Sequence, residues 1–368
     1  MISFIREKYH LIKRMLISYY YSIVFNKKKC YNLLHSIGYD FNEADLCFKE
    51  SLIPDSLEFS FIVPVYNSEK YLKRCIDALL SQKNFNDYEI ICVNDGSTDN
   101  SVAILKSYGD RIKIINQDNQ GIAISRNNGV LCSRGKYVIF VDNDDIVSSN
   151  FLESVSSVIN KSNADIVQTS YSCIDELGNF VSEHRFENCI FDRISKNIKD
   201  KTRGYIWGCA IRKSIFKNIK FPTSFWYEDM ITKMALLRFC KKIVVTSEIL
   251  YYYRVHNTNA SKILWKSKNV KSVDQYWLAV QLNEFCKRNL LALDDYSYSV
   301  LLGEFGKIMW WRTRDLEFQA RIAIYKLASY YIKDQKKNNS FVLTDEEQKL
   351  EQALLSGSFI KWLNLFEQ

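Results

Sequence analysis

The chain has 368 residues, of which 47% are hydrophobic and 14% aromatic, which excludes a disordered chain and predicts a large core. The formal net charge of +8 at pH 7 raises the hypothesis of a nucleic-acid partner. However, much of the basic excess lies in the first thirty residues, so we do not expect a nucleic acid as the partner.

The first thirty residues are basic, aromatic and helix-prone. Residues such as Arg6, Lys13 and Lys28 alternate with apolar side chains, a pattern typical of helices on an anionic membrane surface. A helical hairpin packed on the rest of the protein fits this pattern equally well. No signal peptide and no run of about 18 apolar residues is evident. We expect residues 1–56 to form a helical basic extension of a cytoplasmic protein that can contact the inner face of the plasma membrane.

Residues 57–147 alternate between apolar strands and amphipathic helices. We predict strands at 58–65, 88–93, 112–115 and 136–141, and helices at 68–80, 99–105 and 120–131. This alternation implies parallel pairing and right-handed crossovers, hence an α/β fold with a Rossmann-like sheet. There is no G-x-G-x-x-G after the first strand and no P-loop motif, so a dinucleotide cofactor is disfavoured.

The fourth predicted strand ends in a cluster of carboxylates, Asp142, Asp144 and Asp145. Ligands of open α/β sheets bind at the carboxyl ends of strands. Three like charges this close repel one another unless they share a cation, and Mg²⁺ and Mn²⁺ prefer oxygen ligands. A turn that caps the next helix is the alternative, and this motif alone leaves both interpretations open.

Four motifs together resemble a known family: F-I-V-P-V-Y-N-S-E-K-Y-L at 61–72, V-N-D-G-S-T-D-N-S at 93–101, N-Q-G-I-A-I-S-R-N-N-G at 119–129 and F-V-D-N-D-D at 140–145. They are similar to the nucleotide-sugar-binding half of glycosyltransferase family 2, inverting enzymes with the GT-A fold. The resemblance implies a GT-A catalytic domain at 57–262, with a nucleotide-sugar half at 57–147 and an acceptor half at 148–262. From about Trp265 the pattern changes to helices, so we expect a helical C-terminal region at 263–368.

The resemblance also implies a nucleotide-sugar donor, expected to carry UDP, and a divalent metal, Mn²⁺ or Mg²⁺. Tyr66 would stack on the base, Asp95 would accept hydrogen bonds from the uracil, and His256 would bind metal or phosphate. The residues expected to bind the nucleotide-sugar are Pro64, Val65, Tyr66, Glu69, Asp95, Gly96, Ser97, Arg126, Asp142 and Asn143, and those expected to bind the metal are Asp144 and His256.

On the acceptor side, the family's motif places the catalytic base at Asp229, with Glu228 beside it, at the start of a predicted amphipathic helix. A residue that only caps this helix is the alternative for Asp229. Ring surfaces suit sugar stacking, and a glycine leaves room for substrate. The residues expected to face a glycan or lipid-linked acceptor are Trp207, Gly208, Trp226 and Tyr227.

Several broader expectations follow. The Q-x-x-R-W motif of the family's processive polymerases is missing, so we expect addition of one sugar or a few, in lipopolysaccharide, capsule or other surface-glycan assembly. The helical regions can bind acceptor, membrane or a second copy of the chain. Ten cysteines without a C-x-x-C pair predict buried free thiols. A nucleotidyltransferase and a noncatalytic nucleotide- or glycan-binding module remain as alternatives.

Overall fold

The computed structural model describes residues 20, 24–257, 259 and 269–367. Most of the basic N-terminal segment for which we considered membrane contact lies outside these residues. The described residues form two compact units. One comprises the described residues up to Glu43, Phe225–Tyr227 and the residues from 269 onward, and the other comprises 44–224 with the described part of 228–262. Within the described residues, no helix is both long enough and apolar enough to cross a bilayer.

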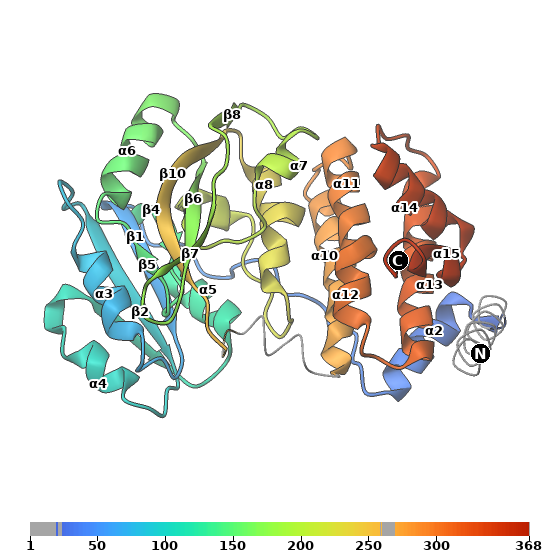
Figure 1. The fold of residues 1–368 in the computed structure, drawn as a ribbon, viewed down its shortest axis with the longest axis horizontal. Coiled ribbons are helices and arrows are strands. Elements are labelled where there is room, and N and C mark those ends of the chain that lie inside the picture. Colours follow the sequence, from blue (N-terminus) through green and yellow to red (C-terminus); the bar gives the residue numbers. More distant parts are fainter. Residues whose placement is uncertain (1–19, 21–23, 258, 260–268, 368) are drawn as a thin grey trace. The chain divides into compact units, whose positions relative to one another are not determined.

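The larger unit contains a mixed sheet (Figure 1). Its described strands are β1 (Leu57–Val65), β2 (Tyr88–Asp95), β3 (Lys113–Gln117), β4 (Gly135–Phe140), β5 (Ile146–Val147), β6 (Ile166–Ile174), β7 (Phe180–His184), β8 (Cys189–Phe191), β9 (Cys209–Arg212) and β10 (Ile243–Arg254). The strand order is β3-β2-β1-β4-β9-β6-β10-β5, with β7 beside β6 and β8 beside β10. The four predicted strands are β1 to β4, and they pair in parallel as expected.

Helices cover this sheet and build the second unit (Figure 1). In the larger unit they are α3 (Leu72–Leu80), α4 (Ser101–Lys106), α5 (Ile122–Cys132), α6 (Phe151–Ser162), α7 (Ile198–Lys201) and α8 (Leu237–Phe239). In the helical unit they are α2 (Lys27–Ser36), α10 (Asp274–Arg288), α11 (Asp295–Gly303), α12 (Met309–Thr313), α13 (Phe318–Lys336), α14 (Asp345–Ser356) and α15 (Phe359–Leu363). The long helix α13 packs on α2 and α14, and fully buried rings such as Tyr325 and Trp362 fill this second core.

The central strands explain how the sheet positions helix α5. Residues 59–65 of β1 are all buried, as expected for a parallel strand that is covered on both faces. A Cβ on Gly129 would lie 2.3 Å from the Ile62 side chain, so the glycine allows α5 to approach β1 closely. Arg126 lies three residues before Gly129 and is therefore on the same face of the helix. The sequence thus directs Arg126 towards the sheet.

The structure corrects one predicted element and extends others. Residues 228–237 do not form a regular amphipathic helix: a 3₁₀ turn at Glu228–Met230 is followed by a π-helical turn at Thr232–Leu236 and then by α8. Such turns often occur at functional sites. Strand β9 begins at Cys209, directly after the predicted acceptor residues Trp207 and Gly208. All ten cysteines are free thiols, and seven of them are buried while Cys47 is exposed.

Candidate active site

The carboxylate loop at 142–145 lies between β4 and β5 and is held in place by β10. Strand β5 pairs antiparallel with β10 at Tyr251 and Tyr252. The Tyr251 hydroxyl donates to Asp145 at 2.6 Å and accepts the Asp142 backbone N–H at 3.2 Å. Asp145 also accepts the Arg254 backbone N–H at 2.7 Å. Asp145 is fully buried, and its contacts are those of a residue that fixes the loop.

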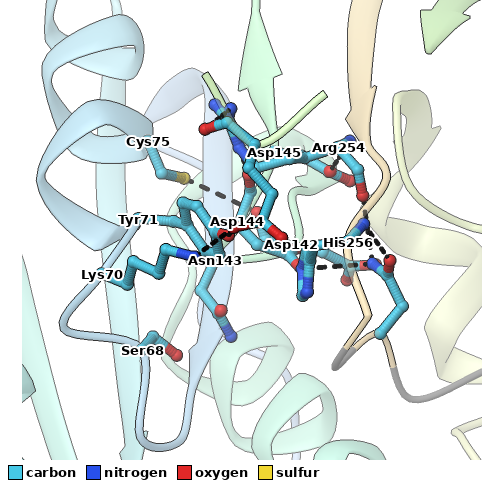
Figure 2. A network of polar contacts seen from close by, with 12 residues as sticks. Ser68, Lys70, Tyr71, Cys75, Asp142, Asn143, Asp144, Asp145, Arg254 and His256 are labelled. Carbon is cyan, nitrogen blue, oxygen red and sulfur yellow. Dashed lines mark hydrogen bonds and ion pairs between the residues drawn. The ribbon is translucent and has the colours of Figure 1, made fainter. Parts of the chain in front are cut away.

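Asp144 meets His256 at this loop (Figure 2). Asp144 Oδ2 and His256 Nε2 lie 2.8 Å apart, and both side chains are mostly buried. The His256 ring packs against Tyr71, with ring centroids 5.0 Å apart, and the His256 backbone N–H donates to Asn259 at 2.6 Å. The structure therefore brings together the two residues that the sequence predicts as metal ligands. Among the described residues, no group of three or more His, Cys, Asp or Glu side chains is arranged to hold a metal.

Arg254 is buried and connects the carboxylate loop to the turn after β6 by hydrogen bonds. Its Nε donates to the Asp144 carbonyl at 2.8 Å, and its Nη1 donates to the carbonyls of Asp175 and Glu176 at 2.9 and 3.1 Å. The guanidinium lies over the Tyr71 ring at 5.1 Å. Its Nη2 is buried and has no hydrogen-bond partner among the described residues. Arg254 therefore keeps an unused donor beside Asp144.

Arg126 joins the two carboxylate motifs of the sequence. Its Nη1 donates to Glu228 at 2.9 Å and to Asp229 Oδ1 at 3.0 Å, and its Nη2 donates to Asp142 at 3.2 Å. Its side chain is only 1% exposed. One buried cation thus sets Asp229 close to Asp142, so both motifs belong to a single site at the carboxyl edge of the sheet.

This crowding changes the proton affinity of the carboxylates. Burial raises the pKa of Asp142 to about 6, against the opposing pull of Arg126. Burial likewise raises the pKa of Asp229 to about 7, which Arg126 opposes and Glu228 reinforces. Asp229 keeps 34% of its side-chain surface exposed, so solvent and ligands can reach it. A carboxylate with a pKa near neutrality is suited to accepting a proton.

Several of the predicted nucleotide residues lie at or just after the ends of β1 and β2. Pro64 and Val65 are the last two residues of β1, and Tyr66, which follows them, is 48% exposed. The Asn143 side chain donates to the Pro64 carbonyl at 2.8 Å, which ties the carboxylate loop to β1. Glu69 accepts the Asn100 backbone N–H at 3.0 Å. These contacts join the ends of neighbouring parallel strands.

Asp95 is buried and holds a loop of the chain itself. Its Oδ1 accepts the backbone N–H of Gln120 and its Oδ2 that of Gly121, both at 2.8 Å. Gly96 has φ +71°, and a Cβ there would lie 2.8 Å from the Asn119 nitrogen, so the tight turn requires glycine. Ser97 accepts the Asn67 backbone N–H at 3.1 Å. The predicted hydrogen bond from a base to Asp95 would therefore use the carboxylate lone pairs that these backbone N–H groups leave free.

The predicted acceptor residues fall into two groups. Trp207 and Gly208 lie in the larger unit next to β4, where the Gly208 N–H donates to Phe140 at 3.1 Å. The space beside Gly208 is filled by the side chains of Arg203 and Tyr251, so the glycine makes room for these rather than for substrate. Trp226 and Tyr227 belong to the helical unit, where the Arg312 guanidinium lies 3.7 Å from the Tyr227 ring centroid.

Sequence reasoning missed the residues that organise the site. Tyr71, Tyr251 and Asn259 were not selected, and Arg126 was considered only as a neighbour of the nucleotide. Tyr251 and Arg254 stand in an aromatic and basic run at the end of the long strand β10, which is a weak signal. The contacts that reveal their function join residues about 110 positions apart, such as Tyr251 and Asp145.

The fold and the site together place this protein among the α/β proteins whose ligand site lies at the carboxyl edge of a parallel sheet, here with carboxylates gathered at that edge. Residues 60–220 match the family described as Glycosyl transferase family 2. Glycosyltransferase GlyG of Streptococcus pneumoniae serotype 4 is 32% identical over 212 residues, which cover 53% of this chain and 70% of GlyG. Glycosyltransferase GlyA of the same organism is 31% identical over 232 residues, which cover 59% of this chain but only 33% of GlyA.

Among solved structures, S. aureus TarS 1-349 in complex with UDP-GlcNAc superposes with a TM-score of 0.68 at 20% identity, covering 84% of this chain and 91% of that one. This likeness confirms the expected GT-A fold. The chain therefore belongs to glycosyl transferase family 2, a family of glycosyltransferase enzymes, as its motifs indicated.

Proposed function

We propose that this chain transfers a sugar, a hexose or N-acetylhexosamine, from a UDP-sugar to a hydroxyl of a glycan or lipid-linked acceptor, with inversion at the anomeric carbon. The reaction depends on Mn²⁺ or Mg²⁺ and serves the assembly of a surface polysaccharide. The family supports the reaction class. The UDP-GlcNAc complex of TarS, which has a similar fold, makes UDP-GlcNAc the first donor to test.

The donor set at the carboxylate loop fits a divalent cation. Asp144 supplies a hard oxygen and His256 a nitrogen, a combination that suits Mn²⁺ better than Ca²⁺. When bound, the cation would neutralise the charge that develops on the departing diphosphate. Arg254, whose Nη2 has no partner among the described residues, lies beside Asp144 and would donate to the same diphosphate.

Side chains of the protein itself activate the acceptor hydroxyl. Arg126 occupies Asp229 Oδ1, so we assign Oδ2 to the incoming hydroxyl. Asp229 removes the hydroxyl proton, the acceptor oxygen forms a bond to the anomeric carbon, and the bond from that carbon to the diphosphate oxygen breaks. Glu228 shares Arg126 and orients the pair. The proposal rests on one observation. The Arg126 guanidinium donates hydrogen bonds to both Asp229 and Asp142 and so holds the two carboxylates close together.

Asp229→Asn tests the proposal directly. The substitution preserves the shape of the side chain and removes the base, so transfer should fall by about 10²- to 10⁴-fold. UDP binding should stay within about twofold of the wild type, because the UDP contacts we propose lie elsewhere. The assay measures UDP release from a panel of UDP-sugars, with and without acceptor extracts, alongside UDP titrations.

Asp110→Asn is the matched control, because Asp110 is exposed on the turn before β3. It should change neither measurement. Substantial transfer by Asp229→Asn would exclude Asp229 as the base. UDP binding without any transfer or hydrolysis by the wild type, for every sugar in the panel, would favour the noncatalytic binding module instead.

A further inference from the structure

The residue that precedes the Glu228–Asp229 pair has an unusual backbone conformation. Tyr227 has φ +65°, and Ser224, three residues earlier, has φ +67°. Residues other than glycine rarely adopt this left-handed region, and a bulky side chain stays there only where its surroundings hold it. Tyr227 directly precedes Glu228, so its conformation sets the direction in which the chain enters the proposed base, Asp229.

The backbone next to Tyr227 is anchored in the helical unit, to which Phe225–Tyr227 belong. The Trp226 backbone N–H donates to Asp274 Oδ2 at 2.7 Å. Asp274 is the first residue of α10 and is only 1% exposed, and its Oδ1 accepts the Tyr39 hydroxyl at 2.7 Å. The segment that ends at Tyr227 is therefore bound to a buried carboxylate.

The Tyr227 ring is held by a cation of the same unit. The Arg312 guanidinium lies 3.7 Å from the ring centroid, which is the geometry of a close cation–π contact. Arg312 lies in α12 and also donates to the side chain of Gln275, the second residue of α10. One face of the Tyr227 ring is thus covered, and both the ring and the neighbouring backbone are fixed by contacts within the helical unit.

The conformation of Tyr227 determines where Asp229 can lie. Glu228 and Asp229 each accept a hydrogen bond from Arg126 Nη1, at 2.9 and 3.0 Å. Consecutive Cα atoms are about 3.8 Å apart, so turning Tyr227 into the ordinary right-handed region would swing Asp229, two residues later, by several ångström. A hydrogen bond tolerates a change of only a few tenths of an ångström. Both carboxylates would then lose their contact with Arg126.

We propose that Tyr227 is a positioning residue for the proposed base, Asp229. Arg312 and Asp274 hold the segment that ends at Tyr227 in its left-handed turn, and this turn directs Asp229 onto Arg126. The inference rests on the proposed function, in which Asp229 is the base. It assigns Tyr227 a role other than the predicted contact with the acceptor, because Tyr227 acts through the backbone that follows it.

The first comparison is between Tyr227→Gly and Tyr227→Ala. Both variants lose the ring, but glycine adopts a positive φ at little cost, whereas alanine disfavours it by roughly a factor of ten. Positioning by the turn therefore predicts that Tyr227→Ala loosens residues 228–236 more than Tyr227→Gly does. A ring that only fills space predicts the opposite order or no difference, since glycine adds flexibility to the chain.

Hydrogen–deuterium exchange of the full chain provides the readout, because it requires no acceptor. The amides of residues 228–236 should exchange about tenfold faster in Tyr227→Ala than in the wild type, with Tyr227→Gly in between. Arg312→Met removes the cation from the ring and should accelerate exchange in the same residues, and Arg312→Lys should restore most of the protection. Peptides from β1 and β4 should exchange like the wild type in each variant.

Two matched controls come from the same helical unit. Leu290 also has a positive φ, +60°, and is 93% exposed, so Leu290→Ala should leave exchange of residues 228–236 unchanged. Arg314 also lies over a ring, that of Trp311 at 5.7 Å, and Arg314→Met should change nothing there either. Equal exchange in Tyr227→Ala and Tyr227→Gly, unchanged exchange in Arg312→Met, or acceleration in either control would overturn the proposal. If Arg312→Met unfolds the helical unit, the two Tyr227 variants decide alone.

Kinetics separate this inference from the proposed function. With UDP-GlcNAc as donor, the kcat for UDP release should fall about tenfold or more in Tyr227→Ala, while the KM for the donor stays within about twofold. Absence of UDP release by the wild type for every sugar would refute the proposed transfer, whereas the exchange data would still decide whether Tyr227 positions residues 228–236. A loss of transfer without faster exchange would indicate direct contact of Tyr227 with the acceptor and would overturn the positioning role.

Discussion

Arg126→Met is the most informative perturbation of the site, because it removes a cation that three carboxylates share. The side chain is 1% exposed and contacts Asp142, Glu228 and Asp229 at 2.9 to 3.2 Å. Removing one partner of a buried ionic network leaves uncompensated charge and costs about 3–5 kcal/mol of unfolding free energy. For a unit of about 200 residues this corresponds to a fall in Tm of roughly 6–20 °C.

The loss should depend on pH. Burial holds the pKa of Asp142 at about 6 and that of Asp229 at about 7, above their ordinary value of 3.8. Raised pKa values mean that the folded protein binds these protons more tightly than the unfolded chain. The resulting contribution to stability is fully present below pH 3.8 and is lost as the pH rises through 6 and 7. Without Arg126 both pKa values rise further, so Arg126→Met should be most destabilised at pH 8 and least at pH 5.

Denaturant unfolding at pH 5, 7 and 8 provides the assay, with Arg185→Met as the control. Arg185 pairs with Glu183 and both side chains are exposed, so the loss of Arg185 should cost less than about 1 kcal/mol. Adding Glu228→Gln to Arg126→Met should recover part of the lost stability, because it removes one uncompensated charge. A cost below 1 kcal/mol at pH 8, or the same cost at pH 5 and pH 8, would refute the shared-cation interpretation.

Three further outcomes are expected. Asp144→Asn should weaken Mn²⁺-dependent UDP binding about tenfold or more, while UDP binding in EDTA stays unchanged; the same loss in EDTA would contradict a metal role. The kcat/KM for transfer should fall as the pH drops below about 7, because Asp229 must be deprotonated to act as a base; a profile that is flat from pH 5 to 8 would argue against it. Gly208→Ala should cost about 1–3 kcal/mol, because φ is +64° and the new Cβ would lie 2.9 Å from Arg203 and Tyr251. Gly109→Ala, at φ +57° in open space, isolates the backbone part of that cost, and an equal loss in both variants would show that packing around Gly208 is unimportant.

The nucleotide half of the fold was predictable because its signals are local. β1, β2 and β4 each contain a continuous apolar run that is followed by polar turn residues, and the alternation with helices implies parallel pairing. The second half has weaker local signals. Strand β6 ends in a hairpin with β7, and β10 pairs with β5, β6 and β8, so its neighbours come from three distant segments. The local sequence therefore does not show which of these strands pair with one another.

Candidate site residues could be selected from the sequence one at a time, but the contacts that join several of these side chains could not be predicted. Asp144 and His256 were selected separately and lie 2.8 Å apart. An arginine in a helix is ordinarily exposed, so Arg126 considered alone carries no signal of burial. Its burial follows from Gly129, which draws α5 onto β1. Likewise Gly208 suggested space for substrate, whereas the φ value and the neighbouring Arg203 show why the chain needs glycine there.

The carboxylates at 142–145 and at 228–229 each admit an ordinary explanation as turn or cap residues when considered alone. A cap requires no buried cation, and a turn requires no partner about a hundred residues away. Arg126 contacts both motifs from the interior, where an unpaired charge would be strongly destabilising. Two caps on the surface would never need such a residue. The shared guanidinium therefore favours a single functional site over two independent structural turns.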